Sequence, residues 1–90
     1  MAMETCPACQ NESVDMENPV NQAPPTHPGS ILFCPDCQTI LIFDRTPWPN
    51  PTEDPAPYPR LRGMYSDEYQ LLPAPTKADL QARNTAAKNP

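Results

Sequence analysis

Apolar residues gather in one short stretch of this chain, residues 30–44, and are thinly spread elsewhere. Two runs of β-branched and aromatic residues, 31–33 and 40–43, flank a tight turn that contains Cys34-Pro-Asp-Cys37. Strand-forming runs on either side of such a turn are typical of a β-hairpin. The pattern therefore predicts a hairpin with a pair of cysteines at its turn.

The second strand of this hairpin is apolar on both sides. Ile40 and Ile42 point to one face, and Leu41 and Phe43 to the other, because side chains alternate along a strand. Each face must then be covered by another part of the chain. The candidates for the two covers are residues 11–29 and the C-terminal segment.

The segment after the hairpin has a different character. Residues 46–59 are dense in proline, with Trp48 and Tyr58 between the prolines. Proline at this density favours an extended polyproline II strand or linker and disfavours a helix interior. We expect residues 46–65 to form an extended arm, which acts either as a semi-rigid spacer or as a ligand for a proline-binding groove.

Two helical segments are predicted near the C-terminus. Ser66 followed by acidic residues is typical of an N-cap, and Pro73 would end that first short helix. Thr76, with an acid three residues later, indicates a second N-cap, and residues 78–88 are good helix formers. Leu80 is the one large apolar residue there, so we expect a short helix that docks lightly.

Composition describes a small acidic chain: 90 residues with fifteen prolines, two glycines and a net charge of −5 at pH 7. Below about 70–80 residues a domain usually needs a metal or a crosslink besides its apolar core, and the prolines suggest that the ordered part of this chain is that short. Residues 1–44 contain six acids and neither Lys nor Arg, whereas residues 45–90 contain all six basic residues. A surface that binds phosphate needs the opposite sign, so the first half is not expected to bind nucleic acid.

The cellular compartment decides whether the four cysteines are expected as reduced thiols or as disulfides. The N-terminus has neither a basic start nor an apolar run, and no stretch approaches the roughly 18 apolar residues of a membrane span. We therefore expect a cytoplasmic protein whose thiols stay reduced. Disulfides, for which four cysteines allow three pairings, remain the alternative.

Two Cys-x-x-Cys pairs, Cys6 with Cys9 and Cys34 with Cys37, predict one shared metal site. Two intervening residues let both sulfurs reach one ion about 2.3 Å away, and two pairs complete a tetrahedron. Thiolates select zinc, with iron as the alternative. Four protein ligands leave no open position, which makes the predicted zinc structural and not catalytic.

The predicted metal matters for stability and for charge. Structural zinc contributes on the order of 10–16 kcal/mol in small peptides, so its removal should unfold the N-terminal half. Four thiolates and one dication bring that half to a charge of about −8.

A Cys-x-x-Cys loop followed by a hairpin with a second Cys-x-x-Cys at its turn resembles a zinc ribbon. More narrowly, Cys6-Pro-Ala-Cys9, a proline-rich loop, Pro28-Gly29 and residues 30–43 are together similar to small zinc-ribbon proteins of bacteriophages and their bacterial hosts. The resemblance covers about half of the chain. It implies the fold, the four ligands and, if the chain is phage-encoded, the cytoplasm of a bacterial host. It implies little about activity.

The sequence departs from the usual ribbon after each cysteine pair. That position is commonly glycine, which tolerates a positive φ, and here it is Gln10 and Gln38. A non-glycine residue adopts this conformation at some energetic cost. The missing glycines also weaken the similarity to rubredoxins, which share the paired cysteines and bind iron.

Other reactive side chains form no catalytic pattern. His27 is the single histidine, and we expect it at the surface and not on the metal. Asp36 and Asp44 have no evident acid–base partner, and no Gly-rich phosphate loop or nucleophile elbow is present. A redox pair of the thioredoxin type would need a βαβ unit, which the pattern lacks. We therefore expect a protein that is not an enzyme and has no small-molecule substrate.

The sequence thus predicts a small metal-stabilised β domain, a zinc ribbon of two cysteine knuckles and a hairpin, with a proline-rich arm and a short C-terminal helix. Its parts are residues 1–45, 46–65 and 66–90. The leading hypothesis is a non-enzymatic adaptor or inhibitor that binds a larger protein, for example a nucleic-acid-processing machine of the host. The residues proposed for partner contact are Trp48, Tyr58, Arg60, Leu61 and Arg62.

The alternative hypothesis is a nucleic-acid-binding transcription regulator, because many zinc ribbons bind nucleic acid. It would depend on basic residues of the second half and predicts binding that weakens steeply with salt. Pairing of the arginines with the acidic ribbon within the molecule would compete with this role. The basic residues concerned are Arg60, Arg62, Lys77, Arg83 and Lys88.

Overall fold

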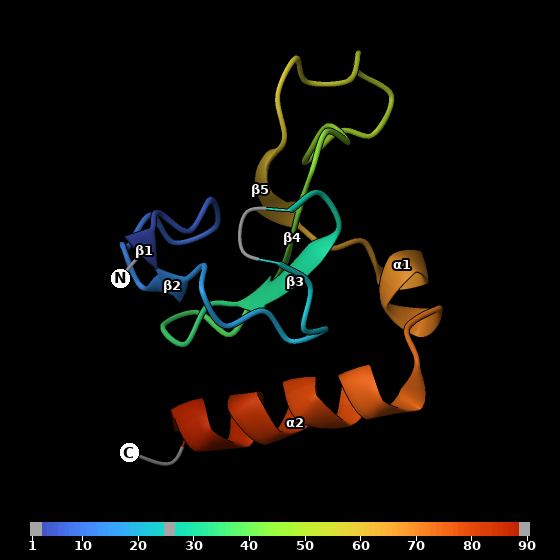
Figure 1. The fold of residues 1–90 in the computed structure, drawn as a ribbon. Coiled ribbons are helices and arrows are strands. Elements are labelled where there is room, and N and C mark those ends of the chain that lie inside the picture. Colours follow the sequence, from blue (N-terminus) through green and yellow to red (C-terminus); the bar gives the residue numbers. More distant parts are fainter. Residues whose placement is uncertain (1–2, 25–26, 89–90) are drawn as a thin grey trace.

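A three-stranded antiparallel sheet lies at the centre of the computed structural model, which describes residues 3–24 and 27–88 (Figure 1). β3 (Ser30–Phe33) and β4 (Ile40–Asp44) form the hairpin that the apolar pattern predicts. β5 (Arg60–Gly63) pairs with the other side of β4, which makes the strand order β3–β4–β5. The hairpin is therefore the core of a larger sheet.

A second, two-stranded sheet lies beside the first (Figure 1). β1 (Met3–Glu4) pairs antiparallel with β2 (Val14–Asp15), and the first cysteine pair lies in the loop between them. β2 packs against β3. The first cysteine loop is thereby brought to the turn of the β3–β4 hairpin.

The chain between β4 and β5 is not an extended arm. Residues 45–59 form a loop that projects at the top of Figure 1 and returns as β5. The Ala56 N–H donates to the Arg45 carbonyl at 2.9 Å, and Arg45 Nε donates to the Ala56 carbonyl at 2.8 Å. The Tyr65 hydroxyl donates to the Pro47 carbonyl at 2.7 Å. The proline-rich segment is thus a loop with a closed base, and the strand that follows it was not expected from the sequence.

The first helix, α1 (Ser66–Gln70), starts one residue earlier than the capping pattern indicates. Tyr65 and not Ser66 is the N-cap residue. The Glu68 side chain accepts a hydrogen bond from the Tyr65 N–H at 3.0 Å, which satisfies one of the free backbone donors at this helix end. The acidic third position of the helix therefore does the capping, and the serine hydroxyl does not.

The second helix, α2 (Ala74–Lys88), is longer than predicted. It begins before Thr76, which the sequence indicated as its N-cap, and includes Pro75 in its first turn. Proline is tolerated there because the first-turn N–H groups have no partner within the helix. The Lys77 N–H donates to the Pro73 carbonyl at 3.1 Å and closes that turn.

Both faces of the central sheet are covered, as the alternation in β4 predicts. Val14, Met16 and the cysteine loops cover the face of Leu41. The two helices together with Val20 cover the face of Ile40 and Ile42. We call the first set the knuckle core: Cys6, Val14, Met16, Leu32, Cys34 and Leu41. We call the second set the helix core: Val20, Ile31, Phe33 and Leu80, with Ile40, Ile42, Met64, Tyr69, Leu72 and Ala87 around them.

The overall dimensions agree with this folded-back arrangement. The radius of gyration is 12.4 Å, close to the roughly 12 Å expected for a globular chain of this length. Within residues 3–24 and 27–88, neither helix has the length and the apolar character that a membrane crossing needs.

Candidate metal centre

Each cysteine pair lies in a turn of the same construction. The Gln10 N–H donates to the Cys6 carbonyl at 2.8 Å, and the Gln38 N–H donates to the Cys34 carbonyl at 2.8 Å. Both glutamines are left-handed, with φ of 68° and 58° respectively. The positive φ expected after each cysteine pair is therefore confirmed. We call residues 6–11 the first knuckle and residues 34–39 the second knuckle.

A further backbone hydrogen bond closes each knuckle. The Cys6 N–H donates to the Asn11 carbonyl at 2.9 Å, and the Cys34 N–H donates to the Thr39 carbonyl at 3.1 Å. The Ala8 N–H lies 3.4 Å from Cys6 Sγ and points a donor at that sulfur. Two local turns with the same hydrogen bonds thus present two pairs of sulfurs to each other.

The four sulfur atoms lie within 4.8 Å of one another. Cys6 Sγ is 3.6 Å from Cys37 Sγ, and Cys9 Sγ is 3.7 Å from Cys34 Sγ. A tetrahedron whose corners are about 2.3 Å from its centre has edges of about 3.8 Å. A disulfide would need about 2.05 Å, and all four thiols are free. The sulfurs are therefore spaced to hold one metal ion and not to form disulfides.

A cation would suit the environment of the sulfurs. Cys6 and Cys34 are fully buried, and burial raises the pKa of the Cys34 thiol to about 12. Burial acts in the same direction on Cys37, but hydrogen bonds with Thr39 outweigh it and lower the pKa of that thiol to about 7. Four thiolates in such a site repel one another, and a divalent cation compensates their charge.

Polar side chains beside the sulfurs join the two knuckles. The Ser13 hydroxyl, just after the first knuckle, donates to the carboxylate of Asp36 in the second. Thr39 Oγ1 is 3.1 Å from Cys37 Sγ. When the sulfur is a thiolate, the hydroxyl is the donor in that contact and orients the ligand, as outer-shell groups of metal sites commonly do. The contact between Ser13 and Asp36 could not be expected from the sequence, because it joins residues that are 23 positions apart.

Arg62 lies inside the molecule. Its side chain is 2% exposed and is surrounded by acceptors from three elements. Nε and Nη2 donate to the Asp44 carboxylate at 2.7 and 2.9 Å, and Nη1 and Nη2 donate to the Glu68 carboxylate at 2.7 Å each. Nη1 also donates to the Gly63 carbonyl at 3.0 Å. These five bonds match the five donors of a guanidinium, so Arg62 pairs within the molecule and has no donor left for a partner.

The other residues proposed for partner contact surround the base of the proline-rich loop. Tyr58 is 76% exposed, Arg60 is exposed, and Leu61 is half-buried against the knuckle core. Trp48 packs on Gly63: a Cβ at that glycine would lie 2.6 Å from the indole ring. These side chains come from one region, but Trp48 and Leu61 are partly used by the fold itself.

The basic residues of the nucleic-acid alternative do not gather on one surface. Arg60 is on β5, whereas Lys77 and Arg83 are on α2, with the β3–β4 hairpin between them (Figure 1). Lys77 Nζ donates to the Gln70 carbonyl at 3.0 Å, and Arg83 Nη1 donates to the Asn18 carbonyl at 2.9 Å. The Lys88 side chain lies outside the part of the chain described.

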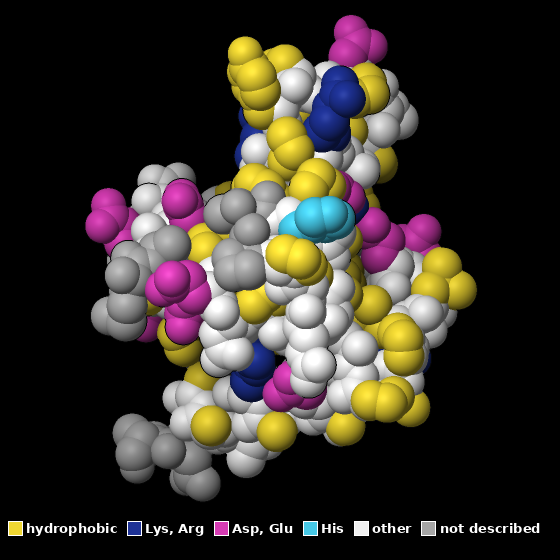
Figure 2. Space-filling model, in the orientation of Figure 1, with side chains coloured by type: hydrophobic (Ala, Val, Ile, Leu, Met, Phe, Trp, Pro, Cys, Tyr) yellow, Lys and Arg dark blue, Asp and Glu magenta, His cyan; other side chains and the backbone are white. Residues whose placement is uncertain are grey.

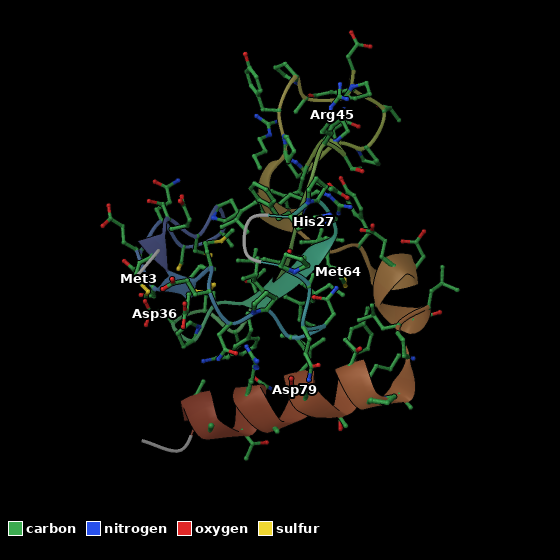
Figure 3. The ribbon with its side chains drawn as sticks, in the orientation of Figure 1. Met3, His27, Asp36, Arg45, Met64 and Asp79 are labelled. Carbon is green, nitrogen blue, oxygen red and sulfur yellow. The ribbon has the colours of Figure 1, made fainter. Side chains whose placement is uncertain are left out.

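His27 is exposed, and its Nδ1 is 2.9 Å from the Pro28 carbonyl oxygen. It is not part of the cysteine cluster. Figure 3 draws it apart from Asp36, which marks the second knuckle. The expectation of a surface histidine is confirmed.

Comparison with known proteins adds no relationship: no protein-family model, no curated protein and no solved structure matches this chain. The evidence for the metal centre is therefore the geometry of its four sulfur atoms.

Proposed function

We propose that this protein is a zinc-ribbon adaptor or inhibitor: one structural Zn²⁺, bound by the four cysteines, holds a surface that binds a larger protein. The observation that carries the proposal is the cluster of four sulfurs from two matched knuckles. A metal bound there has four protein ligands and no position for a substrate or a reactive water. Its contribution is to hold the fold.

Zinc is proposed as the metal because it needs only four thiolates in a tetrahedron, with no redox partner. Iron fits the same donor set and is the alternative. Metal analysis of the purified protein separates them. One equivalent of zinc and a colourless protein would support the proposal, and one equivalent of iron with visible absorption would contradict it.

The charge of the surface supports a protein partner. Acidic side chains gather over the β1–β2 end of the molecule (Figure 2). Glu4, Glu12, Asp15 and Asp36 are exposed in a half of the chain that has neither Lys nor Arg. With the bound metal, that half carries about −8, which repels phosphate and steers basic protein surfaces toward it.

The proline-rich loop supplies a second feature suited to binding. Residues 49–55 are exposed at the projecting end of the loop, and Tyr58 follows them at the surface. Proline limits the freedom of this loop before binding, so little conformational entropy is lost when a partner contacts it. Tyr58 is the most exposed aromatic side chain described and is the proposed anchor.

A pull-down with the tagged, zinc-loaded protein tests the proposal. The bait is incubated with bacterial lysate, with and without nuclease, beside a Cys34→Ser variant that loses one ligand. The expected result is one protein at stoichiometric yield that survives nuclease and is lost with the variant. That protein is then purified and mixed with the bait to show a complex by gel filtration. Recovery of nuclease-sensitive material alone would refute the proposal.

A further inference from the structure

An open groove of about 340 Å³ lies between the second knuckle and the last turns of α2. Its apolar wall consists of Phe33 and Pro35 on the sheet side and Ala86 and Ala87 on the helix side. The volume is at the lower end of the range of about 300–1,000 Å³ for ligand pockets. An open groove of this size suits a side chain presented by another polypeptide.

The shape of the groove follows from the residues that line it. Phe33 is 9% exposed and belongs to the helix core, so the floor of the groove is continuous with packed apolar residues. Ala86 and Ala87 are the helix residues at this end, and their small side chains leave the space above Phe33 open. A larger residue at either position would fill the groove.

One rim of the groove is negatively charged. Asp15 lines it, and Asp36 follows Pro35 in the second knuckle. Asp15 accepts a hydrogen bond from the Glu17 backbone N–H, and Asp36 accepts one from the Ser13 hydroxyl, but neither bond neutralises the carboxylate. Within residues 3–24 and 27–88, the ion pairs formed by basic side chains involve neither aspartate.

Arg83 also lines the groove but is already paired. Its Nε is 3.3 Å from Asp79 Oδ1, and its Nη1 donates to the Asn18 carbonyl. Asp79 therefore offsets part of the Arg83 charge, on the helix side of the groove. The net charge of the rim that faces the knuckles stays negative.

We infer that this groove binds a basic segment of the partner protein. One large apolar side chain of that segment, such as leucine or tryptophan, packs on Phe33 between Pro35 and Ala86. Lysine or arginine residues next to it pair with Asp15 and Asp36. The inference rests on the proposed function and adds to it the chemistry of the partner.

The charge of the groove and of the whole chain argues against other occupants. Nucleic acid and anionic membranes present phosphates, which the two aspartates repel. A second copy of this chain is acidic too, with a net charge of −5 before any metal binds, and like-charged copies repel each other. A basic segment of another protein is the occupant that complements both the apolar floor and the acidic rim.

Two synthetic peptides test the inference directly. One has a central tryptophan flanked on each side by two lysines, and its matched counterpart has glutamate in place of each lysine. The zinc-loaded protein, labelled with ¹⁵N, is titrated with each peptide and followed by amide chemical shifts. The expected changes for the lysine peptide are confined to the groove, at Ser13, Phe33, Ala86 and Ala87. Binding of the glutamate peptide should be at least about tenfold weaker.

Matched variants separate binding in the groove from general attraction. Ala86→Trp fills the groove and should abolish the localised shifts, whereas Ala78→Trp, exposed on the same helix, should leave them unchanged. Asp15→Asn keeps the acceptor for the Glu17 N–H and should weaken binding several-fold, whereas Asp54→Asn in the exposed loop should not. Zinc content and the spectrum of each free variant establish that it is folded.

Three results of the peptide titrations would overturn the inference. In the first, the protein binds the lysine peptide and the glutamate peptide with equal affinity. In the second, Asp15→Asn and Asp54→Asn weaken binding of the lysine peptide equally. In the third, the amide shifts in the groove change with protein concentration in the absence of peptide. The last result would identify a second copy as the occupant. If the pull-down partner is retained by Ala86→Trp, the groove is excluded while the proposed function stands. If no protein partner exists, the proposed function fails by itself.

Discussion

The two faces of the central sheet are covered in different ways. On one face the knuckle core is built from short loops and a two-residue strand pair, and two of its six buried members are cysteines. On the other face the helix core is covered by a helix of 15 residues, and its buried members are all aliphatic or aromatic. We expect the first face, where regular structure is scarce, to depend on metal ligation and the second to depend on side-chain packing.

Arg62 joins the edge strand of the sheet to the first helix. It lies on β5 and pairs with Asp44 on β4 and Glu68 on α1. Its guanidinium also lies 5.4 Å from the centre of the Tyr65 ring. Arg62 thus fixes the position of α1 on a sheet whose two faces are otherwise apolar. The comparison predicts that the two faces respond differently to metal removal and to mutation.

The largest effect should come from removing the metal. Structural zinc contributes on the order of 10–16 kcal/mol in small peptides, which is comparable with the whole stability of a typical domain, about 5–15 kcal/mol. We expect a chelator to abolish the amide dispersion of residues 3–16 first. The NMR spectrum with excess chelator, and again after zinc is restored, checks this. Native dispersion in the metal-free protein would show that the knuckle core does not need the ion.

Leu80→Ala should have the largest effect on the helix core. Leu80 is 2% exposed and is the one large aliphatic residue that α2 buries. Loss of its side chain should cost about 3–5 kcal/mol. Leu71→Ala is the matched control, because Leu71 is 85% exposed and should change stability by less than about 0.5 kcal/mol. Urea denaturation of both variants measures the difference, and equal midpoints would mean that α2 is not packed as described.

Arg62→Met should cost about 3 kcal/mol, the lower end of the range for breaking a buried ion pair. The lower end applies because the Asp44 and Glu68 side chains are 24% and 33% exposed and can be partly rehydrated. Arg60→Met, two residues earlier on the same strand and exposed, is the control and should be nearly neutral. A variant at Arg62 as stable as the control would refute a structural role for the ion pairs.

The same cluster predicts a pH dependence. Burial raises the pKa of Asp44, but Arg62 outweighs it and lowers that pKa below 3.8, and hydrogen bonding to Arg62 lowers the pKa of Glu68 below 4.5. Carboxylates with a lowered pKa stabilise the fold above their unfolded pKa, and this contribution is lost as pH falls through the folded value.

The stability gap between wild type and Arg62→Met should therefore be complete at pH 7 and become smaller below about pH 4.5. Urea midpoints of both proteins between pH 7 and pH 3 measure it. Metal release at low pH affects both proteins alike. The difference between their stabilities therefore reports the contribution of the ion pairs that Arg62 forms with Asp44 and Glu68. A stability gap that stays constant over this pH range would show that Arg62 does not lower the pKa values of Asp44 and Glu68.

The smallest effect concerns the knuckles themselves. A left-handed conformation costs a non-glycine residue about 1–2 kcal/mol, and glycine loses about 0.5–1 kcal/mol more in chain entropy. Gln38→Gly, at φ 58°, should therefore stabilise the protein by up to about 1 kcal/mol. Gln81→Gly within α2 is the matched control and should destabilise it by about 1 kcal/mol. Loss of stability in both variants would mean that the Gln38 backbone is not strained.

Local patterns in the sequence were sufficient for the features that depend on neighbouring residues. The hairpin follows from two apolar runs and a turn, and the metal centre follows from the Cys-x-x-Cys spacing. The need for two covers follows from the alternation in β4. The signal for each lies within a short segment, in the hairpin, in each cysteine pair or in the alternation along β4, where sequence spacing is a direct measure of geometry.

Features that depend on distant contacts were decided only by the tertiary structure. β5 has a charged, proline-preceded sequence, and it becomes a strand because β4 offers it backbone partners. Arg62 was proposed for partner binding from its place in a basic cluster, and the fold buries it between Asp44 and Glu68. The groove beside the second knuckle exists because α2 packs its alanines near Phe33. No repeating spacing of residues in the sequence indicates these contacts, because each joins segments that are brought together only when the sheet is packed.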